Sequence, residues 1–309
     1  MLYSQSVESR LEQWRQSAAD LGRALNKDPD VKWPAARKIY LDTLARLFPA
    51  PANVLVSDLT MAGMPTSVIA PATLNGDRVM LYLHGGGYAS GGRQAYHGLG
   101  GQFANLLNAE VYIPDYRLAP EHPFPAAIDD VLAAYLFLID EGRDPASIVI
   151  SGDSAGGAMV VTLMRKIRDL GLAQPAAGVA ISPWANLEHT GRSACDREGR
   201  DPLCSAEFLG LLADNFLGHE LPSHPDASPV FADVRNIAPV MIQIGENEVM
   251  MSDGIRLAGH LAEQRVRVSL EVWPEMFHVW HLFFQHLPQA DKALENAAAF
   301  LLAALKERE

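Results

Sequence analysis

The strongest constraint on the fold of this chain is a glycine-rich turn between a strand-like run and a helix-like run. The run Ser147–Ser151 is apolar and β-branched, and Ala158–Met164 has the composition of a helix. Between them lies Gly152–Gly157, which contains the pattern G-x-S-x-G centred on Ser154. This context is typical of a tight, strained turn that presents a nucleophilic serine beside a helix N-terminus. Side chains on the two glycines of the pattern would collide with the neighbouring strand and helix.

Composition indicates a folded protein and narrows its partners. The 309 residues are 49% hydrophobic and 20% charged, which suits one α/β domain with an added lid. A net charge of −12 argues against nucleic acid or an anionic membrane surface as a main partner. The first residues lack the pattern of a signal peptide, and no run approaches a membrane span, so we expect a cytoplasmic protein without stable membrane insertion. We expect Cys195 and Cys204 to be free, buried thiols, with a local bridge as the alternative.

The periodicity of apolar residues predicts the order of the elements. Two amphipathic helices come first, over residues 4–26 and then around Ile39, Leu41 and Leu44, before Pro49. Strands are predicted at 54–60, 66–70, 78–83, 110–114, 147–151, 178–182, 239–244 and 267–273. Helices are predicted at 125–141, 155–170, 252–264 and 289–306. This alternation indicates an α/β protein with a parallel sheet and crossover helices, after an antiparallel pair at 54–70.

Five segments carry a family resemblance: His84–Gly87, Asp115–Glu121, Gly152–Gly157, Ser182–Trp184 and Met276–Trp280. Together they resemble the hormone-sensitive-lipase-like (bacterial family IV) esterases of the α/β-hydrolase fold superfamily. The resemblance implies a mostly parallel central sheet flanked by helices, with a helical cap over the active site.

The same resemblance implies a division of the chain into a catalytic domain and a cap. Residues 51–183 and 236–309 would form the α/β-hydrolase catalytic domain. Residues 1–50 would form the N-terminal part of the cap. Residues 184–235 break the strand–helix rhythm and would be the inserted cap segment, with a helical patch around Phe208 and Phe216.

A reactive serine requires a base within hydrogen-bond reach and an acid that orients the base. In α/β-hydrolases these residues follow in the order serine, acid, histidine. His278 comes shortly after the last predicted strand, which places it at the carboxyl end of the sheet near Ser154. We therefore interpret His278 as the base, with His281 as the alternative.

The acid should lie on the loop after the strand that ends at Ile244. Family members usually show an aspartate three residues beyond the glycine of this loop, and here that position is Glu248, one methylene longer. Asp253 is the main alternative and Glu246 the lesser one, although Asp253 also suits the first turn of a helix. We interpret Glu248 as the acid.

An oxyanion hole requires backbone donors aimed at the developing negative charge. Ala155, which follows the serine, would supply one N–H group, and the resemblance assigns the others to Gly86 and Gly87. Two further groups of residues are expected near the site. Asp115, Arg117 and Glu121 are interpreted as one structural polar cluster beneath it. For six apolar residues, lining the substrate pocket and simple packing in the lid or core are equally good interpretations: Tyr88, Trp184, Leu209, Leu212, Phe216 and Phe277.

The function that this pattern predicts is a serine carboxylesterase. It would hydrolyse small-molecule esters through an acyl-enzyme intermediate, without a metal or an organic cofactor, and the family resemblance implies short- to medium-chain acyl groups. A lactone or amide hydrolase with the same residues is an alternative, and a non-catalytic ligand receptor on this scaffold is a more distant one. The sequence leaves the oligomeric state open between a monomer and a homodimer.

Overall fold

One sheet organises the fold. The computed structural model of the chain describes residues 3–28 and 31–307. Within them eight strands follow the order β1-β2-β4-β3-β5-β6-β7-β8. The pairs β1–β2 and β2–β4 are antiparallel, and every other neighbouring pair is parallel. The predicted α/β-hydrolase architecture, with a mostly parallel sheet that begins in an antiparallel pair, is therefore confirmed.

The element bounds lie within a few residues of those predicted. The strands are β1 (Val54–Met61), β2 (Met64–Pro71), β3 (Val79–Leu83), β4 (Glu110–Pro114), β5 (Ile148–Asp153), β6 (Ala177–Ile181), β7 (Val240–Gly245) and β8 (Val268–Trp273). The helices are α1 (Gln5–Leu25), α2 (Trp33–Leu47), α3 (His97–Leu107), α4 (Ala126–Asp140), α5 (Ala155–Asp169), α6 (Ser193–Asp196), α7 (Ala206–Leu217), α8 (Met251–Glu263) and α9 (Pro288–Lys306). Short 3-10 turns are η1 (Arg93–Tyr96), η2 (Pro145–Ser147), η3 (Pro229–Phe231) and η4 (Trp280–Phe283).

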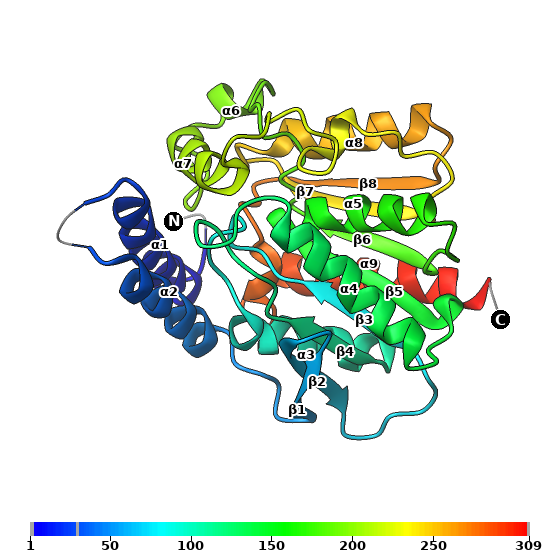
Figure 1. Cartoon of the computed structure of the whole chain (residues 1–309). Helices are drawn as coiled ribbons and strands as arrows, with labels where there is room; N and C mark the ends of the chain where they lie inside the picture. The colour runs from blue at the N-terminus through cyan, green and yellow to red at the C-terminus, as the bar shows by residue number, and fades with distance from the viewer. Residues whose placement is uncertain (1–2, 29–30, 308–309) are drawn as a thin grey trace.

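Helices cover both faces of the sheet, which explains why its central strands are apolar throughout. Along β3, Val79 and Leu81 belong to one buried core, whereas Met80 and Tyr82 belong to the other. Helices α4, α5 and α8 supply the first core, and α3 and α9 supply the second (Figure 1). Because successive side chains of a strand point to opposite faces, a strand buried on both sides reads as a continuous hydrophobic run.

The first two helices lie outside the sheet. Helices α1 and α2 pack against each other, α1 also contacts α7, and these helices lie together at one end of the sheet (Figure 1). The predicted apolar stripe of α1 is buried along its whole length, from Val7 to Leu25. The predicted stripe of α2 is partly wrong, because Ile39 is 49% exposed and Tyr40 lies on the buried face with Leu44.

One helix was not predicted, and the prediction for the two cysteines is partly wrong. Helix α3 was not predicted, because its three glycines give it a weak helical pattern; Gly98 is there for close packing, since a Cβ on it would lie 2.4 Å from the Phe48 carbonyl oxygen. Both cysteines are free, but Cys195 is exposed rather than buried and Cys204 is half-buried.

The described residues leave small gaps in the predicted units. Residues 1–2 and 29–30 of the predicted 1–50 unit, and 308–309 of the catalytic domain, lie outside them. Among the helices that are described, none combines the length and the apolar character required to cross a membrane.

Candidate active site

Ser154 lies at the turn between β5 and α5. Its φ and ψ angles are 56° and −120°, a conformation that L-residues rarely adopt. The turn is held on both sides, since the Ser154 N–H donates to the Ile181 carbonyl at 2.9 Å and the Ser154 carbonyl accepts from Trp184 N–H at 3.0 Å. The predicted strain at this serine is confirmed.

The glycines of this turn allow close approach of backbone to backbone. A Cβ on Gly156 would lie 1.9 Å from the Leu83 carbonyl oxygen. A Cβ on Gly152 would lie 2.6 Å from the Leu83 and the Gly156 carbonyl oxygens. The predicted collision with the neighbouring strand and helix is therefore confirmed, and it explains how the turn brings Ser154 to the carboxyl end of β3 and β5.

His278 follows β8 and is hydrogen-bonded to Glu248. The distance from His278 Nδ1 to Glu248 Oε2 is 2.9 Å, and the two side chains are almost wholly buried. The other carboxylate oxygen of Glu248, Oε1, accepts from Ser182 Oγ at 2.8 Å and from the Gly245 N–H at 2.6 Å. With both oxygens engaged, the carboxylate holds the His278 ring with Nδ1 as its donor and Nε2 as its acceptor.

Burial and neighbouring charges act in opposite directions on the pKa of His278. Burial disfavours the charged imidazolium, but the hydrogen bond and the charge of Glu248 favour it. The charges of Asp201 and Asp153 add to the effect of Glu248, and the net result is a raised His278 pKa. The environment thus stabilises the protonated ring, which is the state that a general base reaches after it accepts a proton.

The competing acid candidates lie elsewhere. Asp253 is in the first turn of α8, and its Oδ2 accepts from the Asn186 N–H at 3.1 Å. Burial raises its pKa to about 8. Glu246 accepts from the Glu275 N–H at 3.0 Å. Neither carboxylate forms a hydrogen bond with His278 in the described part of the chain.

The competing base, His281, is buried in the second core. Its Nε2 is 2.9 Å from Gln243 Oε1, and burial lowers its pKa to about 3. A ring that is hydrogen-bonded to a β7 side chain and kept neutral suits a structural role.

The loop after β3 presents unpaired N–H groups. Gly86 and Gly87 have φ angles of +119° and +61°, and a Cβ on Gly86 would lie 2.3 Å from the Ser90 carbonyl oxygen. In the hydrogen bonds recorded for residues 3–28 and 31–307, the N–H groups of Gly86 and Gly87 have no partner. Ala155 opens helix α5, where N–H groups also lack helical partners. Unpaired donors near a nucleophile are suited to binding an oxyanion.

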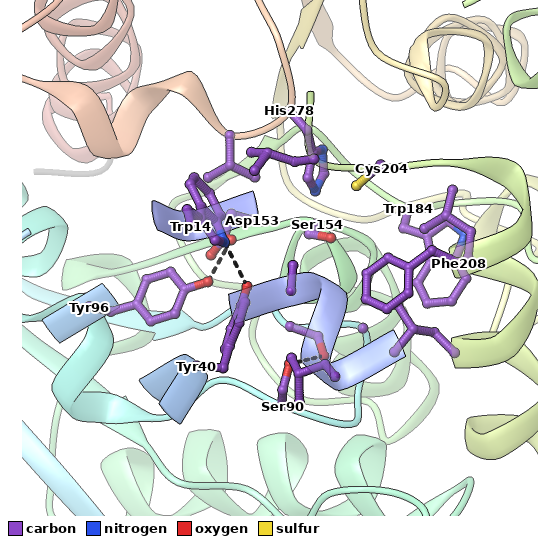
Figure 2. Close-up of a pocket in the computed structure, with 18 residues that line it drawn as sticks. Trp14, Tyr40, Ser90, Tyr96, Asp153, Ser154, Trp184, Cys204, Phe208 and His278 are labelled. Atoms are coloured by element: carbon purple, nitrogen blue, oxygen red, sulfur yellow. Dashed lines mark hydrogen bonds between the residues drawn. The ribbon is translucent and has the colours of Figure 1, made fainter. Parts of the chain in front are cut away.

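A small cavity brings these groups together. Its volume is about 50 Å³, and Ser154, His278, Gly86 and Gly87 all line it. Figure 2 shows Ser154 and His278 among the side chains that line this cavity. The cavity walls also include residues far away in the sequence, among them Trp14, Tyr40, Trp184, Leu209 and Leu212. Of the predicted pocket residues, Trp184, Leu209 and Leu212 line it, whereas Tyr88 stacks on Phe216 and Phe277 contacts Phe283.

Comparison with known proteins identifies the family. A profile described as the alpha/beta hydrolase fold matches residues 80–282, which is more than half of the chain. The chain belongs to the α/β-hydrolase fold family.

Relatives of this α/β-hydrolase are esterases. The chain is 40% identical over 239 residues to an acetyl-hydrolase of Streptomyces hygroscopicus, covering 77% of this chain and 80% of the relative. It is 30% identical over 268 residues to an esterase of Acinetobacter venetianus, covering 86% and 88%. A crystal structure of an esterase from the bacterial hormone-sensitive lipase family superimposes with a TM-score of 0.91 at 34% identity, covering 99% and 100%. This α/β-hydrolase is therefore a carboxylic ester hydrolase of the hormone-sensitive-lipase-like group.

Sequence reasoning missed Asp153, which supports the glycine loop of this hydrolase. Asp153 is buried, and its oxygens accept from the Tyr82 hydroxyl, the Tyr96 hydroxyl and the Gly85 N–H, each at 2.9 Å. Burial raises its pKa to about 6, against the opposing effect of these donors. The sequence feature that could have indicated this role is the position of Asp153 directly before Ser154. A residue at that point of the turn lies beside the end of the neighbouring strand, β3.

Ser182 was also missed as a part of the site. Its hydroxyl donates to Glu248 and accepts from the Val279 N–H at 3.1 Å, so it ties the acid to the loop that carries His278. The sequence showed it only as part of a family segment, because its partners are 66 and 97 residues away along the chain.

The predicted polar cluster is corrected. Asp115 pairs with Arg93, Arg117 with Asp130, and Glu121 with Arg37. These are three separate ion pairs that anchor three different elements, rather than one cluster beneath the site. The sequence could not show this, because Arg93 and Arg37 come from earlier segments and Asp130 from the helix that follows.

Proposed function

We propose that this protein is a serine carboxylesterase in which Ser154, His278 and Glu248 act together. The observation that supports this most directly is the common cavity. A strained serine, a histidine oriented by a buried carboxylate, and unpaired N–H groups of Gly86 and Gly87 all meet there. This combination has the parts that acyl transfer requires: a nucleophile, an oriented base and oxyanion donors.

In the first half of the reaction, Ser154 Oγ attacks the ester carbonyl carbon while His278 Nε2 accepts the hydroxyl proton. Glu248 holds the Nδ1–H and stabilises the imidazolium. The carbonyl oxygen becomes negative and accepts from the N–H groups of Gly86, Gly87 and Ala155; one such donor contributes about 3 to 4 kcal/mol to lowering the barrier. When the intermediate collapses, the carbon–oxygen bond to the alcohol breaks and His278 transfers its proton to the departing oxygen.

In the second half, water hydrolyses the acyl-enzyme. His278 takes a proton from water, and the hydroxide attacks the acyl carbon in the same oxyanion site. Collapse releases the carboxylic acid, and the proton returns to Ser154. Each group thus ends in its starting state, and the chemistry uses only these side chains and backbone donors.

The size of the cavity favours short acyl groups within the predicted short- to medium-chain range. About 50 Å³ leaves room for an acetyl-sized group beside Ser154, since the walls include Trp184, Leu209 and Leu212. The relative from Streptomyces hygroscopicus is named an acetyl-hydrolase, which agrees with this size. We therefore infer acetyl and similarly short acyl esters as the preferred substrates.

We also infer that residues 1–50 and 184–235 form a cap over the site. Trp14 of α1, Tyr40 of α2 and Leu212 of α7 all line the cavity, although these helices lie outside the sheet. Trp14 Nε1 donates to the Tyr40 hydroxyl at 3.1 Å, which joins α1 to α2 at the cavity wall. Such a cover would exclude bulk water from the acyl-enzyme.

We also propose that the protein forms a homodimer and is located in the cytoplasm. The two outer strands of the sheet, β1 and β8, expose apolar side chains such as Leu55 and Val272, and an exposed apolar edge is a common site of pairing between copies. Light scattering of the purified protein would distinguish a dimer from a monomer.

The decisive experiment compares wild type with Ser154→Ala on p-nitrophenyl esters from acetate to palmitate. We expect turnover to be highest for acetate and butyrate and to fall steeply for longer chains. Ser154→Ala removes the attacking oxygen and should reduce kcat by at least about 10⁴-fold. Equal turnover by the two proteins would contradict the proposed mechanism. A preference for palmitate would contradict the inferred preference for short acyl groups. Thermal unfolding of the variant serves as the control for folding.

A further inference from the structure

The glycine-rich loop after β3 (residues 84–90) has a backbone conformation that its own sequence does not favour. Three consecutive residues have positive φ angles: Gly86 at +119°, Gly87 at +61° and Tyr88 at +60°. Glycine adopts such angles freely, but a residue with a Cβ does so only where the surrounding structure holds it. The unpaired N–H groups of Gly86 and Gly87 therefore keep their direction only if contacts from outside fix the rest of the loop.

A tight turn links the glycines of this loop to its last residues. The N–H groups of Ala89 and Ser90 both donate to the Gly86 carbonyl oxygen, at 3.2 and 2.9 Å. Because these two bonds close the turn, a displacement of Ala89 also displaces Gly86. Gly86 lines the cavity that contains Ser154, so the position of Ala89 affects the backbone donors in that cavity.

Arg37 of α2 holds Ala89 from outside the loop. Its Nε donates to the Ala89 carbonyl oxygen at 2.9 Å, and its Nη2 donates to the Ala119 carbonyl oxygen at 2.8 Å. The Ala119 N–H in turn donates to the Tyr88 carbonyl oxygen at 2.8 Å. Among the hydrogen bonds of the described part of the chain, the carbonyl oxygens of Ala89 and Ala119 have no other donor. One guanidinium thus holds the loop directly at Ala89 and, through Ala119, at Tyr88.

The guanidinium is itself held in one orientation. Its two Nη atoms pair with the two carboxylate oxygens of Glu121, at 2.9 and 2.7 Å, and its Cζ lies 4.6 Å from the centroid of the Trp33 ring. Only 19% of the Arg37 side chain is exposed. A planar guanidinium serves two carbonyl oxygens and a carboxylate at once, whereas the single ammonium of a lysine does not present donors in these fixed directions.

We propose that Arg37 is a positioning residue for the oxyanion donors, and that it acts by keeping the N–H groups of Gly86 and Gly87 directed at the substrate carbonyl. Arg37 is not among the described residues that line the Ser154 cavity, so its effect passes through the loop. The inference rests on the esterase function proposed above. It adds to that function a role for α2, which lies outside the sheet, in setting the geometry of oxyanion binding (Figure 1).

Removing the donors of Arg37 tests this role. In Arg37→Met the Ala89 carbonyl oxygen loses its donor, and we expect kcat/KM for p-nitrophenyl acetate to fall at least about tenfold. The loss should lie in kcat, with KM within about threefold of wild type, because the oxyanion exists only after attack on the carbonyl. Arg37→Lys keeps a positive charge beside Glu121 but not the fixed donors, so its kcat/KM should fall at least about fivefold. This milder change keeps the test available if Arg37→Met does not fold.

Inhibition by trifluoroacetone separates oxyanion binding from other effects of these substitutions. Ser154 Oγ adds to the ketone carbon, the hydroxyl proton passes to His278, and the ketone oxygen becomes an oxyanion that resembles the transition state. We expect Ki to rise by the same factor as kcat/KM falls. The pH midpoint of kcat/KM should stay at its wild-type value, since burial and the charges of Glu248, Asp201 and Asp153 set the pKa of His278.

Arg168→Met is the matched control. The Arg168 side chain is also 19% exposed, and it also joins a backbone carbonyl, that of Arg235, to a carboxylate, that of Asp169. It lies near the opposite end of α5 from Ser154, so kcat/KM and Ki should stay within about twofold of wild type. Thermal unfolding of each variant verifies that it is folded at the assay temperature.

Three results would overturn the role of Arg37. The first is wild-type kcat/KM in a folded Arg37→Met or Arg37→Lys variant. The second is a fall in kcat/KM without a rise in Ki, and the third is a shift of the pH midpoint that accounts for the whole loss, which would place the effect on His278. The esterase function is tested separately, by wild-type turnover of p-nitrophenyl acetate and its loss in Ser154→Ala. If wild type failed to hydrolyse this ester, the function would fail and the inference with it.

Discussion

At the scale of single residues, the loop around Glu248 shows how a longer side chain takes the place expected for an aspartate. The loop approaches the His278 loop through its backbone, because the Asn247 N–H donates to the Met276 carbonyl at 3.0 Å. A Cβ on Gly245 would lie 2.4 Å from that same carbonyl oxygen. The Gly245 N–H and Ser182 then hold the first carboxylate oxygen, which leaves the second for His278.

The raised pKa of His278 leads to a prediction for the pH dependence. A base must be neutral to accept a proton, so kcat/KM should rise with pH, with its midpoint above the ordinary histidine pKa of about 6.5. Glu248→Gln removes the charge that raises this pKa while burial still lowers it. We expect the midpoint to move to lower pH and the plateau of kcat to fall by about 100-fold or more.

The matched control for this prediction is Asp253→Asn. Burial raises the Asp253 pKa to about 8, so the side chain is largely neutral near pH 7, and an asparagine oxygen could still accept from the Asn186 N–H. This variant should keep the wild-type midpoint and kcat. A loss of kcat confined to Asp253→Asn, measured from the full pH–rate profiles, would transfer the role of the acid to Asp253.

At the scale of elements, α2 is fastened to the loops that surround the site. Arg37 donates to the carbonyl oxygens of Ala89 and Ala119, at 2.9 and 2.8 Å, and forms a bidentate pair with Glu121. Its guanidinium also lies 4.6 Å from the ring centroid of Trp33. One side chain of α2 thus joins a helix outside the sheet to the glycine-rich loop and to the segment after β4. Glu121, which the sequence placed beneath the site, instead anchors this helix.

The glycine-rich loop gives a prediction at the same scale. Gly86→Ala places a methyl group 2.3 Å from the Ser90 carbonyl oxygen at a φ of +119°, so the loop must move and its N–H groups lose their direction. We expect kcat on p-nitrophenyl acetate to fall by about 10² to 10³-fold, the effect of losing an oxyanion donor. Gly142→Ala is the control, because Gly142 also has a positive φ, +83°, but has nothing within 4 Å of the added Cβ. Similar kcat values for the two variants would mean that the Gly86 N–H does not bind the oxyanion.

At the scale of the whole molecule, the net charge of −12 affects which substrates arrive fastest. A carboxylate-bearing ester such as 4-acetoxybenzoate should be repelled at low salt. Its kcat/KM should rise when ionic strength increases from about 0.01 to 0.1 M, because the Debye length falls from about 30 to 10 Å. Neutral p-nitrophenyl acetate should change by less than about twofold. If kcat/KM depended on salt in the same way for the two esters, the net charge would have no effect on how a charged substrate reaches the site.

Local patterns in the sequence were sufficient for the sheet, its crossover helices and the strained serine turn. Each of these features is marked by a pattern over a few consecutive residues: an apolar β-branched run, a helical stripe or a glycine pattern. Such patterns can be recognised without knowing which distant residues they contact. The same holds for the positions of Ser154, Glu248 and His278, since each follows a predicted strand and the carboxyl ends of parallel strands meet at one edge. Helix α3 was not predicted because its glycines serve close packing against distant residues, such as Phe48 at Gly98 and Pro51 at Gly101.

Only the tertiary structure decided what surrounds those residues. The contacts of Ser182 and Asp153, the separate partners of Asp115, Arg117 and Glu121, and the cavity walls from α1, α2 and α7 all join segments far apart in the chain. The volume of the cavity depends on side chains of several elements packing at once, and no periodicity encodes such a volume. The sequence by itself therefore determined the backbone frame and the positions of the candidate residues Ser154, Glu248 and His278 along it, whereas the folded chain determined the shape of the space beside them, because packing is a property of neighbours in space.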